Sequence, residues 1–306
     1  MGHVVIPATK TMQAFEKAVE QDQGSTYRQW LGKVIPCMDD AYRADDGGFR
    51  SHLGVSMLGD ECNAKLFFNF RWATKPRFSG QTLRLFNRGH LEEARFIALL
   101  LAAGIQIYQQ DDNGHQYRVS YRGGHLGSAI DGIVVGCPDF DNQNLAVLTE
   151  MKTHNDKSFA KLKKEGVEES KPEHYTQMQV YMRAYNLPAA LYLAVNKNND
   201  EIWAEIIYLN SEFADMEIDK GIQITTINSL PSRISNTASW FKCKWCEHSD
   251  VCHRGKMPEI NCRTCRYSIT NDDGSWSCVL QDKIITKEDQ LAACSSYNVA
   301  EYYGKK

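Results

Sequence analysis

The chain has 306 residues, of which 42% are hydrophobic and 24% charged, and its formal net charge is −3 at pH 7. This composition indicates a soluble globular protein, and no apolar run reaches the roughly 20 residues that a membrane span requires. The N-terminal residues show no secretion signal, so we expect a cytoplasmic location. The net charge does not favour a nucleic-acid binder, and any such hypothesis must depend on local charge.

The N-terminal third combines amphipathic and basic segments. Apolar side chains at helical spacing predict one or two amphipathic helices within residues 10–45. Residues 62–95 interleave basic and aromatic side chains, which together neutralise phosphates and stack on unpaired bases. The alternative is a packed aromatic cluster with a solvated basic fringe. The candidate DNA-binding residues in this segment are Arg71, Lys75, Arg77, Arg84 and Arg88.

The middle of the chain alternates helical and strand patterns. A helix is expected over residues 89–104, and a turn over 137–144 separates two strands rich in Val, Ile and Leu. The order of helix, hairpin, helix and strands predicts an α/β core. The expected strands and second helix are residues 127–136, 145–152, 172–186 (the helix), 189–195 and 202–209.

The hairpin brings two carboxylates together. A turn centred between Phe140 and Asp141 places Asp131 opposite Glu150, with Cβ atoms about 5 Å apart. Two carboxylates at this spacing repel unless a cation lies between them, which outlines a metal site. Lys152 follows two residues after Glu150, and the alternation of a strand points both side chains to one face.

The helix expected over residues 89–104 supplies a fourth polar group. Glu93 falls within the apolar arc of this helix, whereas Glu92 is expected to point to one side. A buried carboxylate needs a partner, and a divalent cation shared with the hairpin would provide one. His90, one turn earlier, is an alternative or additional ligand. A structural interpretation remains, in which Glu93 pairs with an arginine and Asp131 closes a turn.

These motifs occur in an order that resembles a known family. The segments Gly127–Gly132, Glu150–Lys152 and Gln177–Tyr181 resemble the RecB-like branch of the PD-(D/E)xK nucleases, which includes bacteriophage recombination exonucleases and CRISPR-adaptation nucleases. The segments His52–Cys62 and Arg84–Glu93 are similar to a phage subgroup. Isoleucine stands at position 130 where the family name has proline.

The resemblance implies a restriction-endonuclease-like core, with a central mixed sheet flanked by helices, and a role for each motif residue. Asp131 and Glu150 would bind Mg²⁺ or Mn²⁺, Met151 would offer its backbone carbonyl, and Lys152 would be the catalytic lysine. Gln177 and Tyr181 would position the DNA or the site, and their spacing of four residues puts them on one helix face.

A run of lysines follows the predicted active strand. Lys161 and Lys163 belong to this run and are candidates to contact the DNA backbone near the scissile bond. A solvated helix face is the alternative interpretation.

Eight of the ten cysteines are clustered or placed at ligand-like spacing, which in a reducing compartment favours metal binding over disulfides. Cys243, Cys246 and Cys252 lie within one short loop and need a fourth ligand. Iron–sulfur members of the RecB-like branch have one cysteine before the nuclease motifs and three behind them, which implies a [4Fe-4S] cluster on these three and Cys62. Zinc, with His248 or His253 as the fourth ligand, is the alternative.

The remaining cysteines form a second set that resembles a zinc ribbon. Its members are Cys262, Cys265, Cys278 and Cys294. The expected domains are therefore an N-terminal helical segment (1–60), a nuclease core closed by the first cysteine set (61–255) and a zinc-ribbon-like C-terminal module (256–306).

The sequence thus predicts a Mg²⁺- or Mn²⁺-dependent deoxyribonuclease, and the resemblance implies an exonuclease that acts on DNA ends in phage recombination or genome processing. DNA is the expected partner, together with a phage recombination or replication protein, and no membrane is involved. Two alternatives stay open: a structure-specific endonuclease and a catalytically idle DNA-binding protein on a nuclease scaffold.

Overall fold

The computed structural model describes residues 4–38, 41 and 48–303 and divides the chain into two compact units. Each unit combines stretches that are distant in sequence, whereas the sequence analysis expected three consecutive domains. Unit 1 holds Met1–Asp45, Phe78–Val119 and Ala129–Asp215, and unit 2 holds Asp46–Arg77, Ser120–Ser128 and Met216–Lys306.

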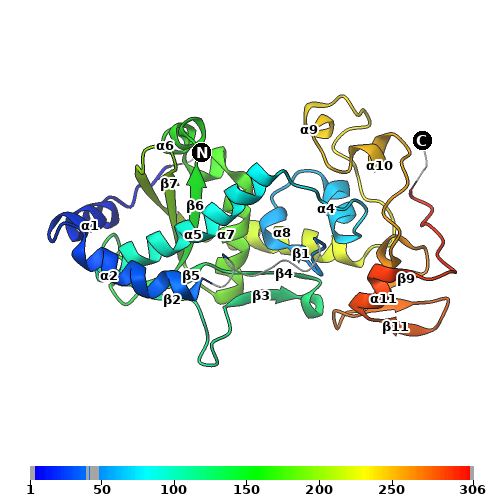
Figure 1. Cartoon of the computed structure of the whole chain (residues 1–306), viewed down its shortest axis with the longest axis horizontal. Helices are drawn as coiled ribbons and strands as arrows, with labels where there is room; N and C mark the ends of the chain where they lie inside the picture. Colours follow the sequence, from blue (N-terminus) through cyan, green and yellow to red (C-terminus); the bar gives the residue numbers. More distant parts are fainter. Residues whose placement is uncertain (1–3, 39–40, 42–47, 304–306) are drawn as a thin grey trace. The chain divides into compact units, whose positions relative to one another are not determined.

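Unit 1 is built on a five-stranded mixed sheet with the strand order β2-β5-β6-β7-β8 (Figure 1). β6 and β7 are parallel neighbours, and the other neighbouring strands are antiparallel. A mixed sheet with helices beside it confirms the predicted α/β core. The strands are β2 (Gln106–Tyr108), β5 (Gly132–Val135), β6 (Val147–His154), β7 (Ala189–Asn196) and β8 (Ile202–Tyr208).

The helices of unit 1 include the predicted N-terminal pair. Positions 39–40 and 42–45 of that prediction lie outside the described residues. In the part of the chain that the structure describes, no helix is long and apolar enough to cross a membrane. The helices are α1 (Thr9–Glu20), α2 (Ser25–Val34), η1 (Ile35–Cys37), α5 (Gly80–Ala102), α6 (Asp156–Ser170) and α7 (Pro172–Tyr185).

The two faces of this sheet differ in chemistry. One face carries Met151 of β6 and Leu193 of β7, which belong to a hydrophobic core with α5 residues such as Phe96. Because side chains alternate along a strand, Glu150 and Lys152 belong to the opposite face. α6 and α7 contact β6 and β7 as well. Glu150 and Lys152 therefore lie on the side of the sheet opposite to this apolar core.

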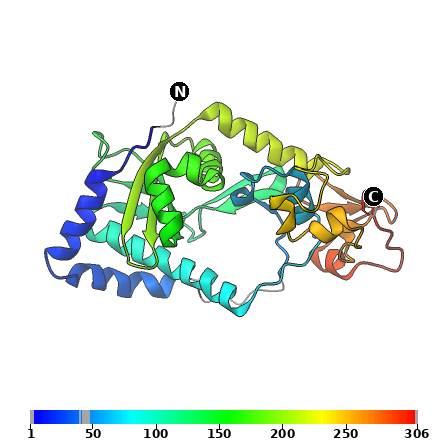
Figure 2. The ribbon, with the colours of Figure 1, turned by 90° about the horizontal axis from the view of Figure 1, so that it is seen from above.

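α5 is longer than predicted. It begins at Gly80 rather than Gly89, because the Ser79 side chain accepts a hydrogen bond from the backbone N–H of Thr82 and caps the helix there. Gly89 lies inside the helix and does not interrupt it. The first turns are largely exposed and extend past the other helices of unit 1 (Figure 2).

The strand predicted over residues 127–136 is two strands in different sheets. β4 (Leu126–Ala129) lies in a three-stranded sheet of order β1-β4-β3, and β5 starts at Gly132 in the main sheet. The break falls at residues 130–131, so Asp131 lies at the point where the chain passes from one sheet to the other. A continuous run of β-forming side chains does not reveal such a change of sheet.

Unit 2 is a set of short elements around a second core. The boundary between the two units falls within α8, a helix of 16 residues, because unit 1 ends at Asp215 and unit 2 resumes at Met216. The three-stranded antiparallel sheet β11-β10-β9 occupies the predicted C-terminal module. The elements are β1 (Leu53–Gly54), η2 (Val55–Met57), α4 (Asn63–Phe70), β3 (Arg118–Tyr121), η3 (Arg122–Gly124), β4, α8 (Ser211–Thr226), α9 (Phe241–Lys244), α10 (Ser249–His253), η4 (Cys262–Thr264), β9 (Ser268–Thr270), β10 (Trp276–Cys278), β11 (Lys283–Ile285) and α11 (Lys287–Ala292).

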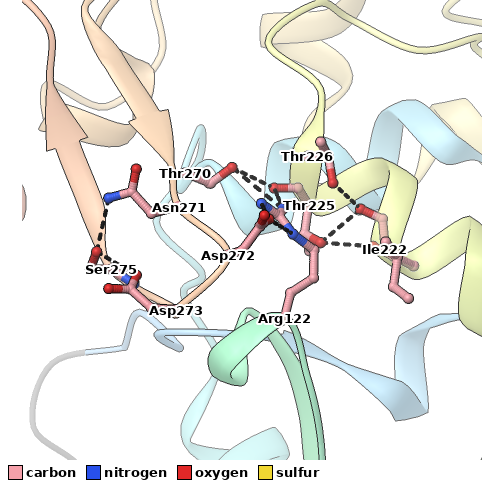
Figure 3. Close-up of polar contacts among 10 residues, drawn as sticks. Arg122, Ile222, Thr225, Thr226, Thr270, Asn271, Asp272, Asp273 and Ser275 are labelled. Carbon is pink, nitrogen blue, oxygen red and sulfur yellow. Dashed lines mark hydrogen bonds and ion pairs between the residues drawn. The ribbon is translucent and has the colours of Figure 1, made fainter.

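A close backbone contact fastens the β9–β10 turn to η3 within unit 2. A Cβ atom added to Gly123, whose φ is +60°, would lie 2.0 Å from the backbone carbon of Asp273, so only glycine fits there. Figure 3 shows Arg122 beside this contact, where it donates to the carbonyl of Thr225 at 2.7 Å and to Asp272 Oδ1 at 2.8 Å. The C-terminal sheet is therefore fixed to residues 122–124 by backbone shape and by the hydrogen bonds of the half-buried Arg122.

Candidate active site

The register of the central hairpin is the predicted one. Gly132 pairs with Thr149 and Ile133 with Leu148, and one further step along the same register brings Asp131 opposite Glu150. Asp131 Oδ2 also accepts a hydrogen bond from the backbone N–H of Met151 at 2.7 Å. Burial, followed by the charge of Glu150, raises the pKa of Asp131 well above its usual range. The ionisation of Asp131 therefore depends on the charge of Glu150.

Lys152 is the cation beside these two carboxylates. Its ammonium forms an ion pair with the fully buried carboxylate of Glu150. Burial lowers the pKa of Lys152, but the charges of Glu150 and Asp131 outweigh it and raise that pKa above its ordinary value. Burial also raises the pKa of Glu150. The protonated form of Lys152 is thus favoured, and this form donates hydrogen bonds and has no lone pair with which to act as a base.

Glu93 of α5 adds a third carboxylate. Its charge raises the pKa values of both Asp131 and Glu150, and its Oε1 lies 3.8 Å from His90 Nδ1. The prediction that only Glu93 faces the buried side is wrong, because Glu92 is the more buried of the two, with 7% of its surface exposed. Glu92 pairs with Arg95 at 3.1 Å, since the neighbouring helices cover this side of α5 too.

Gln177 and Tyr181 lie together on α7, as their spacing predicts. Both side chains are buried, and Gln177 Nε2 donates to the Tyr181 hydroxyl at 3.0 Å. A hydrogen bond from Gln177 also lowers the pKa of Glu150, and the charge of Tyr181 acts on Lys152. This pair from α7 therefore supports the carboxylate and the lysine.

The sequence analysis missed a buried polar chain beside Lys152. The Tyr192 hydroxyl lies 2.9 Å from His154 Nε2 and 2.8 Å from His174 Nδ1, and His154 Nδ1 lies 3.0 Å from Ser158 Oγ. Burial, with nearby lysines, lowers the pKa of His154 to about 4 and that of His174 well below its usual range. Strand alternation carries a signal for His154, because it follows Lys152 by two residues.

The oxygen donors of this site suit a hard divalent cation. The charges of Glu150 and Glu93 raise the pKa of Asp131, and that of Glu93 raises the pKa of Glu150; a bound cation would relieve this repulsion. As they stand, however, no three His, Cys, Asp or Glu side chains in the described ranges are gathered closely enough to hold a metal ion. The donor chemistry therefore fits Mg²⁺ or Mn²⁺, while the described side chains do not form a closed coordination shell.

All four residues of the first cysteine set belong to unit 2. Burial raises the pKa values of Cys243, Cys246 and Cys252, and the negative charge of Cys62 raises each of them further. Cys62 therefore lies in the same region as the other three thiols although about 180 residues separate them in sequence, but no three of these thiols are gathered closely enough to hold a metal ion as they stand. His248, the alternative ligand, is buried and stacks on Phe68.

The second cysteine set lines one small cavity, together with apolar side chains such as Leu280 and Ile285. Burial raises the pKa of Cys262 to about 11, with contributions from the charges of its partners. Four thiols around one cavity suit the donor preference of zinc. The set consists of Cys262, Cys265, Cys278 and Cys294.

The predicted basic and aromatic surface is only partly a surface. Arg71 is buried and donates to the carbonyl of Ile227 at 2.9 Å, with its guanidinium 5.0 Å from the Trp276 ring. Its assignment to DNA binding is therefore wrong. The aromatic side chains of residues 67–72 are also core residues, as the alternative interpretation had it. The other four members, Lys75, Arg77, Arg84 and Arg88, are exposed.

Lys161 and Lys163 of α6 are exposed but paired. Lys161 lies 3.4 Å from Glu165, and Lys163 forms an ion pair with Glu201. These contacts offset much of their charge, which favours the solvated helix face over a strong phosphate contact.

Comparisons with known proteins give likeness of fold only. No family model matches the chain, and no curated protein matches it. Among solved structures, an alkaline exonuclease from Laribacter hongkongensis (LHK-Exo) is 13% identical and covers 64% of this chain and 90% of its own, with a TM-score of 0.39. The same enzyme in complex with dAMP gives the same identity and coverage and a TM-score of 0.41. These overlaps are too loose to assign an activity to this chain.

Proposed function

We propose that this protein is a Mg²⁺- or Mn²⁺-dependent deoxyribonuclease of the PD-(D/E)xK type, RecB-like branch, and that it acts as an exonuclease on DNA ends. One observation carries the proposal: the β5–β6 register sets Asp131 opposite Glu150, with Lys152 paired to Glu150 on the same face of β6. The charge of Glu93 acts on both carboxylates. Two acids and a lysine in this arrangement suit hydrolysis of a phosphodiester.

The residues of the chain have distinct parts in this reaction. Asp131, Glu150 and Glu93, with His90 and the Met151 carbonyl as further candidates, would hold the metal ion. When bound, such an ion lowers the pKa of a coordinated water and neutralises charge on the phosphate.

Lys152 stays protonated, so it orients the attacking water or donates a hydrogen bond to the phosphate oxygens as their charge grows. Gln177 and Tyr181 hold the Glu150 carboxylate and the lysine in place from α7. The site is thus preorganised by hydrogen bonds from α7 and from the hairpin.

DNA would reach this site along the exposed start of α5. Arg84 and Arg88 lie on the helix that also carries His90 and Glu93, and no acidic residue occurs between Ser79 and Leu91. A phosphate backbone bound there would lie close to the metal-binding end of the same helix. Lys75 and Arg77 precede this helix and are exposed as well.

Two structural metals complete the proposal. The set with Cys62 would hold a [4Fe-4S] cluster that ties residue 62 to the loop containing Cys243, Cys246 and Cys252, and the second set would hold Zn²⁺. A phage recombination or replication protein is the proposed partner, in a cytoplasmic setting.

Labelled linear and closed circular DNA, each incubated with Mg²⁺ or Mn²⁺, test the activity. We expect linear DNA to be degraded and circular DNA to survive, and Lys152→Ala to remove most cleavage. Lys17→Ala, an exposed lysine of α1, is the matched control and should cleave as the wild type does.

Each other outcome excludes a part of the proposal. Cleavage of circular DNA would identify an endonuclease, and binding without cleavage of either substrate would identify an idle scaffold. Full activity of the Lys152→Ala variant would reject the assigned site.

A further inference from the structure

Unit 2 carries an exposed group of aromatic and basic side chains around α9. Three large rings within six residues are open to solvent: Trp240 exposes 45% of its surface, Phe241 62% and Trp245 82%. Large aromatic side chains are normally buried or engaged, so a cluster of them at the surface indicates a binding function. We call these three rings with Lys242 and Lys244 the α9 platform.

Two of the three rings, Phe241 and Trp245, each have a lysine ammonium nearby. Lys244 Nζ lies 5.2 Å from the centre of the Trp245 ring, and Lys242 Nζ lies 6.0 Å from that of Phe241. A flat apolar face beside an ammonium matches a nucleotide, whose base stacks while its phosphate meets the charge. The Trp240 and Phe241 rings contact each other, with centroids 5.0 Å apart, and the two lysines lie between this pair and Trp245 in the sequence. Cations among the rings favour a polyanion over an apolar protein surface.

The surrounding charge supports the same partner. Residues 221–246 contain Arg233, Lys242 and Lys244 and no acidic residue. Lys242 is paired with Glu61 at 2.9 Å, so Lys244 contributes most of the local positive charge. Between the lysines, Cys243 is buried and anchors α9 in unit 2. The α9 backbone that carries the rings is therefore anchored, which lowers the ordering cost of binding.

We infer that the α9 platform binds single-stranded nucleic acid by stacking unpaired bases on Trp245 and Phe241. Duplex bases already stack on one another and offer no free face, so the platform should discriminate between the two forms. The inference goes beyond the proposed nuclease activity, because it concerns binding by unit 2 and needs neither Lys152 nor a metal ion at the carboxylates.

Binding of a labelled dT oligonucleotide, about 12 residues long, to the full chain tests this inference. Fluorescence anisotropy in buffer without divalent cations measures affinity with no cleavage, so a failure of the nuclease proposal leaves this result intact. Trp245→Ala should weaken binding about 5- to 150-fold, as expected for the loss of one stacked base, and Trp245→Phe should retain most of the affinity.

Two controls separate stacking from general surface effects. Ile284→Ala removes a similarly exposed apolar side chain (63%) of unit 2 and should leave binding unchanged. Lys244→Gln should lower the slope of log affinity against log salt by about 0.7, the contribution of one phosphate contact on a single strand. Because Trp245 makes so little contact with the fold, its variants should melt at the wild-type temperature, and Phe241→Ala provides a second test.

The inference is overturned if Trp245→Ala and Phe241→Ala bind dT as tightly as the wild type. It is also overturned if Ile284→Ala loses as much affinity, or if blunt duplex DNA binds as tightly and responds equally to Trp245→Ala. Binding to vesicles of phosphatidylcholine and phosphatidylserine without binding to dT would assign the platform to a membrane surface instead. Self-association that Trp245→Ala abolishes, again without dT binding, would assign it to a protein interface.

Discussion

Two adjacent glutamates of α5 should separate stability from catalysis. Glu92 pairs with Arg95, which also contacts Asp200 at 3.1 Å, whereas the charge of Glu93 acts on Asp131 and Glu150. Glu92→Ala should therefore destabilise the fold without harming the chemistry, and Glu93→Ala should do the reverse.

The structure sets the size of each effect. Glu92→Ala removes one charge-assisted hydrogen bond, but Arg95 exposes 38% of its side chain and keeps its second acidic partner, so the loss is about 1–2 kcal/mol. In a chain of this size that corresponds to a fall in melting temperature of roughly 2–8 °C. Glu93→Ala relieves repulsion among carboxylates, so without metal its melting temperature should not fall.

Metal-dependent measurements complete the comparison. Glu93→Ala should lower cleavage at limiting Mg²⁺ or Mn²⁺ about tenfold or more and reduce the rise in melting temperature that the metal produces, whereas Glu92→Ala should stay within about threefold of wild type. Equal losses of activity in the two variants would refute the proposed geometry. A larger effect of His90→Ala than of Glu93→Ala would transfer the ligand role to His90.

Three further predictions concern other parts of the chain. The pKa of His154 is near 6.5 in the unfolded chain but about 4 in the fold, so the free energy of unfolding should decrease by about 1.4 kcal/mol per pH unit as the pH falls from 6.5 to 4. Urea unfolding of the wild type and of His154→Gln should differ in this pH dependence, and an identical pH dependence would contradict the prediction. Gly123→Ala should lower the free energy of unfolding by about 3 kcal/mol or more. Gly255→Ala should lower it by only about 1 kcal/mol, because the added Cβ meets nothing within 4 Å. Similar losses for the two variants in chemical denaturation would disprove the close contact at Gly123. Metal analysis after anaerobic purification should find about four irons and one zinc, with iron lost from Cys246→Ser and only zinc from Cys265→Ser; two zincs and no iron would reject the cluster.

The hairpin was predictable because its signals are local. The turn over residues 137–144 fixes the register, and the register alone brings Asp131 opposite Glu150. Alternation then assigns Lys152 to the same face, and helical spacing assigns Gln177 to that of Tyr181. The α/β class follows from the same short-range periodicities.

The predictions that were wrong concerned residues whose surroundings depend on long-range packing. The arc of α5 was judged from one apolar stripe, but helices also cover its other side, which buries Glu92 against Arg95. Arg71 was predicted to be a surface cation, but carbonyl groups and aromatic rings of unit 2 surround it. The exposure of the α9 rings was not predicted, because it depends on how the surrounding chain packs around the buried Cys243.

The polar face of the unit 1 sheet explains a bend in α6. β7 and β8 set Tyr192 beside Glu205, which is fully buried and would be costly without donors. The backbone N–H of Val167 donates at 3.2 Å to each carboxylate oxygen, and Trp203 Nε1 donates to Oε2 at 3.4 Å. The Val167 N–H points there because Gly166 leaves the helical conformation with φ +74° and ψ 175°. A side chain at position 166 would resist that conformation, so the helix would straighten and withdraw the donor. The kink thus lets one more carboxylate stay buried on the face that carries Glu150 and Lys152, and a substitution of Gly166 should disturb the site without touching any catalytic candidate.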